Sequence, residues 1–276
     1  GPIVASLGVK VAKMSGRGLG HTGGTVDKME SIPGLQTSIE RDEFFDIVNK
    51  YGIAVIGQSG NLVPADKKLY ALRDVTATVD CIPLIASSIM SKKLAAGSDA
   101  IVLDVKTVSG AFMKTVEDSR KLAEKMVSIG TMAGRKCCAV ITNMDIPLGH
   151  AVGNSLEVME AIETLKGNGP ADLTAVCLEL AANMLYMAGK GSLEECRKLA
   201  EGAMADGSAL DALANMVKGQ HGDESYIYHP EKFPRSALSK EVKAEKDGYV
   251  CHMDTGSIGI ASVCLGAGRS RKDDVI

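Results

Sequence analysis

The chain has 276 residues, of which 45% are hydrophobic and 24% are charged, a mix typical of a globular protein with a sizeable core. Its net charge of −3, from 31 basic and 34 acidic side chains, gives no reason to expect a nucleic-acid-binding or membrane-binding surface. The 7 cysteines are odd in number and form no CxxC pair, so we expect buried, reduced thiols and a cytoplasmic protein.

Apolar runs alternate with helical patterns through the first half of the chain. Gly1–Leu7 resembles the middle of an apolar helix, and the end at Lys272–Ile276 is equally abrupt, so we expect both termini to be cuts in a longer chain. In chain order the pattern then predicts a strand at Val9–Met14, a helix at Arg41–Tyr51, a strand at Ile53–Gly57, helices at Ala65–Thr78 and Pro83–Ala96, a strand at Ala100–Val105, a helix at Val116–Ala133 and a strand at Cys137–Thr142.

The second half begins with helices and changes character near residue 224. Helices are predicted at Asn154–Leu165, Leu173–Ala188, Ser192–Ala205 and Ser208–Val217, followed by β-structure at Gly248–Met253 and Ile258–Cys264. Strands that alternate with helices indicate an α/β fold with a mostly parallel sheet and flanking helices. We therefore expect an α/β domain at 1–223, with a helical segment within 153–217, and the start of a C-terminal β-containing subdomain at 224–276.

The segment Ser15–Thr25 is the most informative part of the sequence. It places five glycines, one arginine and several hydroxyl side chains directly after a predicted strand. Glycines allow positive φ angles and a close approach of the backbone to a ligand, and successive N–H groups can then surround an anion. The spacing matches neither GxGxxG nor a Walker loop. From the residues alone, an anion site and a plain surface loop both remain open.

This segment and several others resemble the thymidine and pyrimidine-nucleoside phosphorylases. The resemblance rests on Lys13–Thr25 and Asp27–Gly34, and it continues through Pro64–Lys67, Tyr70–Asp80 and Asp104–Lys106. It extends through Pro147–Asn154 to Met253–Thr255 and Gly268-Arg269, so it covers essentially the whole chain. The implied activity is phosphorolysis of pyrimidine nucleosides such as uridine, thymidine and deoxyuridine to the free base and (deoxy)ribose 1-phosphate.

The resemblance also implies roles for individual residues, with phosphate as co-substrate and no organic cofactor. The implied phosphate contacts are Lys13, Met14, Ser15, Arg17 and Thr25. The implied base contacts are Tyr70, Arg73, Ser88 and Lys92, and the cations Arg73 and Lys92 are the implied catalytic pair. A monovalent cation, K⁺, is implied at Leu148 and Ala151 through backbone carbonyls and at Glu160 through its carboxylate. Lys13 favours an enzyme that accepts both uridine and thymidine, and the family is typically a homodimer.

Two departures from the family pattern affect these expectations. The family uses an upstream Gly-rich loop for phosphate and base, and this chain does not supply it. Val108 stands where the family has Gly, and because a β-branched residue resists positive φ, we expect the loop Lys106–Ala111 to be rearranged. The alternatives are a phosphoribosyltransferase of related fold, which requires carboxylates for Mg²⁺, and an incomplete chain that only binds phosphate or a partner.

Overall fold

The computed structural model describes residues 1–17, 23–57, 63–76, 78 and 81–267, except the side chains of Lys67, Tyr70, Ala71, Asp74 and Val75. Its strands are β1 (Val11–Ser15), β2 (Ile53–Gly57), β3 (Ala100–Thr107) and β4 (Lys136–Asn143). Its helices are α1 (Pro2–Ser6), α2 (Thr25–Glu30), α3 (Arg41–Tyr51), α4 (Pro64–Val75), α5 (Ile82–Ala95), α6 (Val116–Met132), α7 (Asn154–Leu165), α8 (Ala171–Met187), α9 (Leu193–Ala205), α10 (Ser208–Gly219), α11 (Ser225–Tyr228), α12 (Thr255–Ser262) and the short turns η1 (Pro230–Lys232) and η2 (Val263–Ala267). Within the described ranges, no helix is both long enough and apolar enough to cross a bilayer.

The strands form two parallel pairs, β1 with β2 and β3 with β4. Ser15 pairs with Gly57 at the end of the first pair, and Thr107 pairs with Asn143 at the end of the second. The mixed α/β fold and the parallel pairing predicted from the sequence are therefore confirmed. Because each pair is parallel, the segments that follow β1 and β2 leave the sheet at the same edge.

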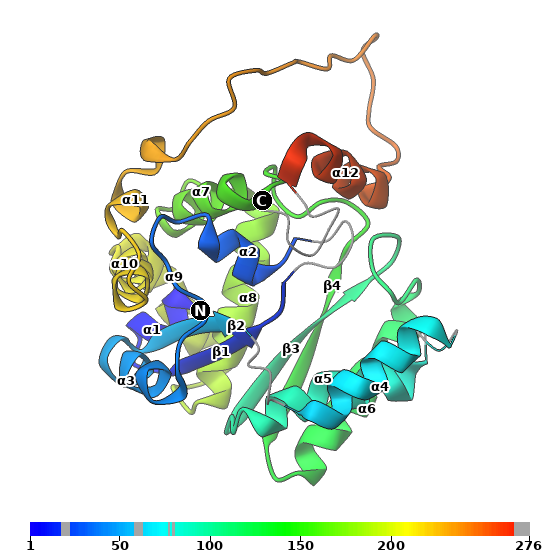
Figure 1. Cartoon of the computed structure of the whole chain (residues 1–276), viewed down its shortest axis with the longest axis vertical. Coiled ribbons are helices and arrows are strands. Elements are labelled where there is room, and N and C mark those ends of the chain that lie inside the picture. Colours follow the sequence, from blue (N-terminus) through cyan, green and yellow to red (C-terminus); the bar gives the residue numbers. More distant parts are fainter. Residues whose placement is uncertain (18–22, 58–62, 77, 79–80, 268–276) are drawn as a thin grey trace.

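Helix α8 lies between the two strand pairs (Figure 1). Its apolar side chains, among them Leu178 and Leu185, share one core with Val11 of β1 and Ile53 of β2. Its other side packs against β3 and β4. In the described part of the chain the two parallel ladders are separate, and α8 packs against both.

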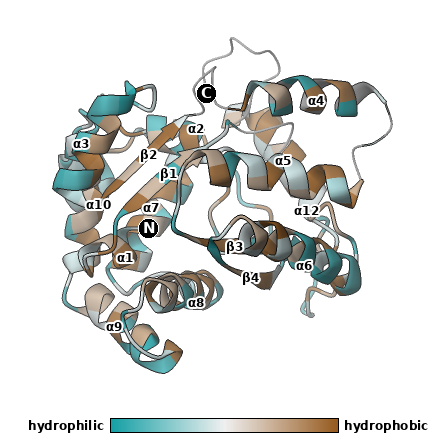
Figure 2. Ribbon diagram, turned by 90° about the horizontal axis from the view of Figure 1, so that it is seen from below, coloured by the Kyte–Doolittle hydropathy of each residue, from teal (hydrophilic) through white to brown (hydrophobic). Residues whose placement is uncertain are grey.

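The pair β3–β4 has its own core on the side away from α8. Burial alternates along β3, where Ile101, Leu103 and Val105 are buried and pack against α5 and α6. Figure 2 shows β1 and β2 in brown, whereas α3 and α6 carry teal on their outer sides. The alternating burial along β3 is the expected result of a strand with one apolar face.

Several helix ends follow from single residues. Helix α3 ends at Gly52, which takes a left-handed φ of 79° that a side chain would oppose. Helix α9 begins with a capping box, in which the Ser192 hydroxyl accepts from the N–H of Glu195 and the Glu195 carboxylate accepts from the N–H of Ser192. The predicted bounds of α3 and α7 match the observed ones, and each helix is followed within two residues by a glycine of positive φ, Gly52 and Gly167.

Gln220, directly after α10, is fully buried and completes the outer edge of β2. Its side-chain oxygen accepts from the N–H of Val55 at 2.8 Å, and its amide nitrogen donates to the carbonyls of Val55 and Gln36, both at 2.8 Å. The N–H of Gln36 returns a bond to the Gln220 carbonyl at 2.8 Å. A side chain thus takes the place of a neighbouring strand at the centre of β2.

The β-structure predicted after residue 224 is wrong for the residues that the structure describes. Gly248–Met253 forms no ladder, and the apolar run that was expected as a strand at Ile258–Cys264 lies within α12 and η2. Asp254 caps α12 by accepting from the N–H of Ser257 at 3.0 Å, which favours a helix over a strand. The expected domain boundary at residues 223 and 224 stays a prediction.

The structure contradicts the expectation that Val108 resists a positive φ, whereas a rearrangement relative to the family's loop stays a prediction. Val108 itself adopts a φ of 73°, the conformation that glycine would take at this position. Its N–H donates to the Met113 carbonyl at 3.0 Å, and its carbonyl accepts from Ala111 at 2.9 Å. A tight turn therefore follows β3, with backbone strain at Val108 that the surrounding hydrogen bonds hold in place.

Candidate functional site

The end of β1 carries the first group of predicted site residues. Ser15 is the last residue of the strand and Thr25 the first of α2, so the Gly-rich segment is described on both flanks, while residues 18–22 lie outside the described residues. Met14, Ser15 and Thr25 are partly buried. Neither hydroxyl of Ser15 and Thr25 forms a hydrogen bond within the described chain, so both are able to bind a ligand.

Lys13 of β1 lies in a positive environment. Its side chain is exposed, yet surrounding protein desolvates it, and the Lys93 and Lys28 ammonium groups add to this effect, so the pKa of Lys13 is lowered from its usual 10.5. Burial and the adjacent Lys92 likewise lower the pKa of Lys93 on α5. Lys28 is neutralised by an ion pair with Glu157 of α7. Cations from β1 and α5 thus lie close enough to repel one another, an arrangement that a bound anion would stabilise.

Arg17 has contacts that its predicted phosphate role did not anticipate. Its Nη1 contacts Asp27 Oδ1 at 2.9 Å and Glu30 Oε2 at 2.6 Å, and its Nη2 donates to Glu30 Oε1 at 2.9 Å. Both carboxylates belong to α2. The guanidinium is therefore directed at two acidic side chains of its own segment.

The second group of predicted residues lies on the antiparallel-running helices α4 and α5. Lys92 Nζ donates to the Ser88 hydroxyl at 2.9 Å and to the Ser88 carbonyl at 3.1 Å, one helical turn earlier. It also forms an ion pair with Asp66 of α4 at 2.6 Å. Because the buried Ser88 oxygen accepts from Lys92, its own proton is left to donate to a ligand.

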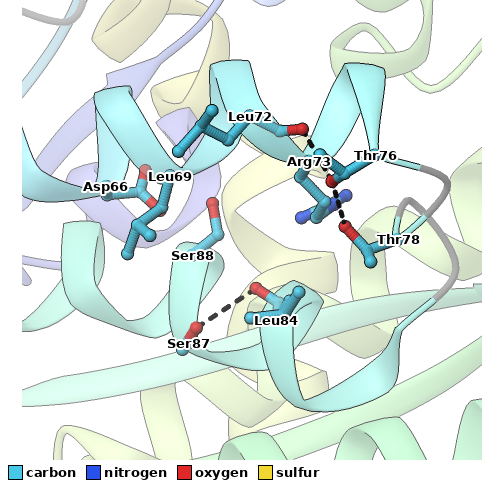
Figure 3. Close-up of a pocket in the computed structure, with 9 residues that line it drawn as sticks. All are labelled: Asp66, Leu69, Leu72, Arg73, Thr76, Thr78, Leu84, Ser87 and Ser88. Atoms are coloured by element: carbon cyan, nitrogen blue, oxygen red, sulfur yellow. Dashed lines mark hydrogen bonds between the residues drawn. The ribbon is translucent and has the colours of Figure 1, made fainter.

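A shallow pocket of about 190 Å³ lies between these two helices. Arg73 and Ser88 line it together with Asp66 and Ser87, and the side chains of Leu69, Leu72 and Leu84 supply apolar surface (Figure 3). Lys92 does not line the pocket but is tied to it through Ser88 and Asp66. The volume is below the range of about 300–1,000 Å³ found for small-molecule sites, so the pocket suits one part of a larger ligand.

The remaining predicted site residues lie on α4, on α7 and on the loop before α7. The Tyr70 side chain lies outside the described residues, although its backbone belongs to α4. Glu160 of α7 reaches the loop that holds Leu148 and Ala151, and its Oε1 accepts from the N–H groups of His150 and Ala151 at 2.8 and 3.0 Å. The structure thus brings all three residues of the predicted cation site to one place.

Gly149 in the same loop lies directly against the Glu160 carboxylate. Gly149 has a φ of 72°, and a methyl group at its Cα would collide with the Glu160 carboxylate. Glu160 Oε2 forms no hydrogen bond with the described part of the chain, so one carboxylate oxygen remains able to bind a cation. In the described chain, no group of three or more acidic, His or Cys side chains is arranged to hold a metal ion.

The family model for the glycosyl transferase family, a/b domain, matches residues 1–210. The chain belongs to this family. The chain is also similar to the pyrimidine-nucleoside phosphorylase of Geobacillus stearothermophilus, which is 59% identical over the whole of this chain. The pyrimidine-nucleoside phosphorylases of Staphylococcus epidermidis and Staphylococcus aureus are 57% identical over the whole of it. The chain spans 64% of the length of each of these curated relatives. The similarity that the Gly-rich motif indicated is thereby confirmed.

Sequence reasoning missed three groups in this member of the glycosyl transferase family. Asp66, Asp27 and Glu30 received no role, although all three lie in the stretches that carried the resemblance. Each carboxylate proves to hold a cation of the predicted site, either Lys92 or Arg17. An acidic residue close in sequence to a candidate Arg or Lys was the available signal, but spacing alone does not identify which cation it contacts.

Proposed function

We propose that this protein catalyses the phosphorolysis of pyrimidine nucleosides, giving the free base and (deoxy)ribose 1-phosphate. The observation that supports this proposal most directly is that Arg73 and Ser88 line one pocket. Lys92 donates a hydrogen bond to Ser88 at the margin of that pocket. The match to the glycosyl transferase family and the similarity to proteins named pyrimidine-nucleoside phosphorylase support the same reaction. By the family resemblance, a lysine at position 13 favours acceptance of both uridine and thymidine, so we include both as substrates.

The chemistry requires cations where the base leaves. As the bond between sugar and base breaks, the base gains negative charge, and fixed positive groups beside it stabilise the transition state. Arg73 and Lys92 supply those groups in the proposal, and the Ser88 hydroxyl donates to a carbonyl oxygen of the base. Asp66 holds the Lys92 ammonium by an ion pair at 2.6 Å, which fixes the direction of the ammonium. The carboxylate also offsets part of the local positive charge.

Phosphate is the nucleophile in this proposal and binds at the end of β1. Lys13, Met14, Ser15 and Thr25 are the assigned contacts, and the unbonded hydroxyls of Ser15 and Thr25 support that assignment. Phosphate held there attacks the sugar from the face opposite the base, so positioning contributes much of the rate. The repulsion among Lys13, Lys28 and Lys93 is relieved when a dianion binds beside Lys13.

We further propose a structural K⁺ held by Glu160 and the backbone carbonyls of Leu148 and Ala151. The unbonded Oε2 of Glu160 supports this site, since hard cations prefer oxygen ligands. A bound K⁺ would supply charge that keeps this loop folded against α7. Function as a cytoplasmic homodimer is part of the same proposal.

The proposal is tested by phosphate-dependent release of uracil from uridine and of thymine from thymidine, without added Mg²⁺. Arg73→Ala and Lys92→Ala should each lower kcat/KM on the order of 100-fold, because an electrostatic donor to the transition state is removed. Arg120→Ala and Lys68→Ala are matched controls on exposed helix positions and should retain wild-type rates.

Near-wild-type turnover in both site variants would overturn the assigned roles. Base release that needs phosphoribosyl pyrophosphate and Mg²⁺ instead of phosphate would overturn the reaction itself.

A further inference from the structure

The contacts of Arg17 form part of a ring, a closed chain of contacts that includes Ser15, a residue of the proposed phosphate site. Its guanidinium contacts Asp27 and Glu30 of α2 at 2.6 to 2.9 Å. The Asp27 carboxylate is only 3% exposed, whereas half of the Arg17 side chain is exposed. Arg17 thus makes a two-pronged contact with the partly exposed Glu30 and a single contact with the buried Asp27. A two-pronged guanidinium contact is more specific than a simple exposed ion pair.

The ring continues from α2 to β2 and returns to β1. Glu30 Oε1 also accepts from the Thr37 hydroxyl at 2.5 Å, and Thr37 is buried. The Thr37 carbonyl accepts from the N–H of Gly57 at 2.8 Å, and Gly57 pairs with Ser15. Contacts therefore run without a break from Arg17 through α2 and the end of β2 to Ser15.

The charges in this ring leave little for an external anion. Within these contacts one guanidinium faces two carboxylates, which disfavours direct phosphate binding by Arg17. The hydrogen bonds that Arg17 donates to Glu30 raise the pKa of Arg17 above its usual range, so the side chain stays charged. Burial opposes ionisation of Glu30, but hydrogen bonds from Arg17 and Thr37 outweigh it and lower the pKa of Glu30.

We infer that Arg17 is a positioning residue, which fixes Ser15 and Thr25 relative to each other and does not itself contact phosphate. The inference rests on the proposed phosphate site and replaces the direct contact expected for Arg17. Arg17 lies two residues after Ser15, and its partners lie two and five residues after Thr25. The clamp therefore joins the two flanks of the Gly-rich segment on which these hydroxyls lie.

A double-mutant cycle separates positioning from direct binding. Arg17→Gln, Glu30→Gln and the double variant are compared by calorimetry with inorganic phosphate. We expect each single variant to weaken phosphate affinity on the order of tenfold, since small displacements of binding groups have large effects, and the double variant to be no weaker than either single one. Affinity for uracil, assigned to the pocket at Arg73, should not change.

If Arg17 instead contacts phosphate directly, the Glu30→Gln variant should give the opposite result. Glu30→Gln would then free the guanidinium and leave phosphate affinity unchanged or tighter, and that outcome would overturn the inference. Arg17→Lys, which keeps the charge but loses the two-pronged geometry, should recover little affinity if positioning is correct. Arg41→Gln, which removes an exposed ion pair with Asp42 on α3, is the control and should leave phosphate binding unchanged.

A readout that needs no ligand distinguishes this inference from the proposed function. Amide hydrogen exchange should quicken at residues 15–17 and 25–30 in Arg17→Gln and Glu30→Gln, because both flanks lose the contact that orders them. A wild-type protein that binds no phosphate counts against the proposed function. Unchanged exchange in both variants would overturn the clamp whatever the ligand.

Discussion

Single residues decide how the positive charges of the site are used. Arg17, Lys28 and Lys92 each face a carboxylate, whereas Lys13 and Lys93 have no acidic partner in the ranges that the structure describes. The residue types were predictable from the sequence, but their pairing was not. Pairing depends on which helix a carboxylate approaches, and residues distant in sequence, such as Lys28 and Glu157, show this clearly.

The unpaired Lys13 leads to a prediction about pH. Burial and neighbouring ammonium groups lower the pKa of Lys13 below 10.5, so it loses its proton earlier than an ordinary lysine as pH rises. A neutral amine no longer attracts a dianion, so phosphate affinity should fall within a window below pH 10.5. Calorimetry with phosphate across this range measures the effect.

Lys13→Met is the test variant, and Lys68→Met on the exposed side of α4 is the control. Losing one charge-assisted contact should weaken phosphate binding by roughly tenfold at neutral pH and flatten the pH dependence. The folded pKa lies below the unfolded one, so the wild type should also gain stability as pH rises through the same window. An unchanged pH profile in Lys13→Met would assign the effect to another group.

At the scale of elements, the turn after β3 carries a measurable strain. Val108 holds a φ of 73°, and a β-branched residue in the left-handed region is unfavourable by about 1–2 kcal/mol. Val108→Gly should relieve that strain, although glycine also gains freedom in the unfolded chain, by about 0.5–1 kcal/mol. We expect a net stabilisation of about 1 kcal/mol in denaturant unfolding. Val102→Gly within β3, where φ is ordinary, should instead destabilise the protein.

Elements with strong local signals were predictable, and those that depend on distant partners were not. Helix α3 and strand β2 were placed correctly because Gly52 separates them with a clear stop signal. The run at Ile258–Cys264 was misassigned because a short apolar segment fits both a helix and a strand. The Asp254 cap and the lack of a pairing strand among the described residues decide for the helix.

At the scale of the whole molecule, Gln220 connects regions far apart in sequence. Its side chain joins the end of α10 to β2 and to the segment before α3. Nothing in the composition around Gln220 marks it as buried, since glutamine is normally exposed. The two separate strand pairs were likewise not predictable, because local patterns do not specify which strands become neighbours.

Removing the Gln220 amide should therefore destabilise the whole fold. Gln220→Leu leaves the N–H and carbonyl of Val55 buried without partners, and unsatisfied buried groups are unfavourable by about 1–3 kcal/mol each. We expect a loss of about 3 kcal/mol, seen as a lower Tm in calorimetry. Gln36→Leu changes an exposed side chain while keeping the backbone contacts, so it should have little effect.

The position of Gln220 has a consequence for solubility as well. An open strand edge is a template on which a second chain can add a strand, and proteins block such edges with other groups. Along β2 the Gln220 side chain bonds the N–H and the carbonyl of Val55, and the Thr37 carbonyl accepts from the N–H of Gly57. These backbone groups are therefore not left for a foreign strand. Gln220 and the Thr37 carbonyl thus cover this edge of β2 against the addition of another strand.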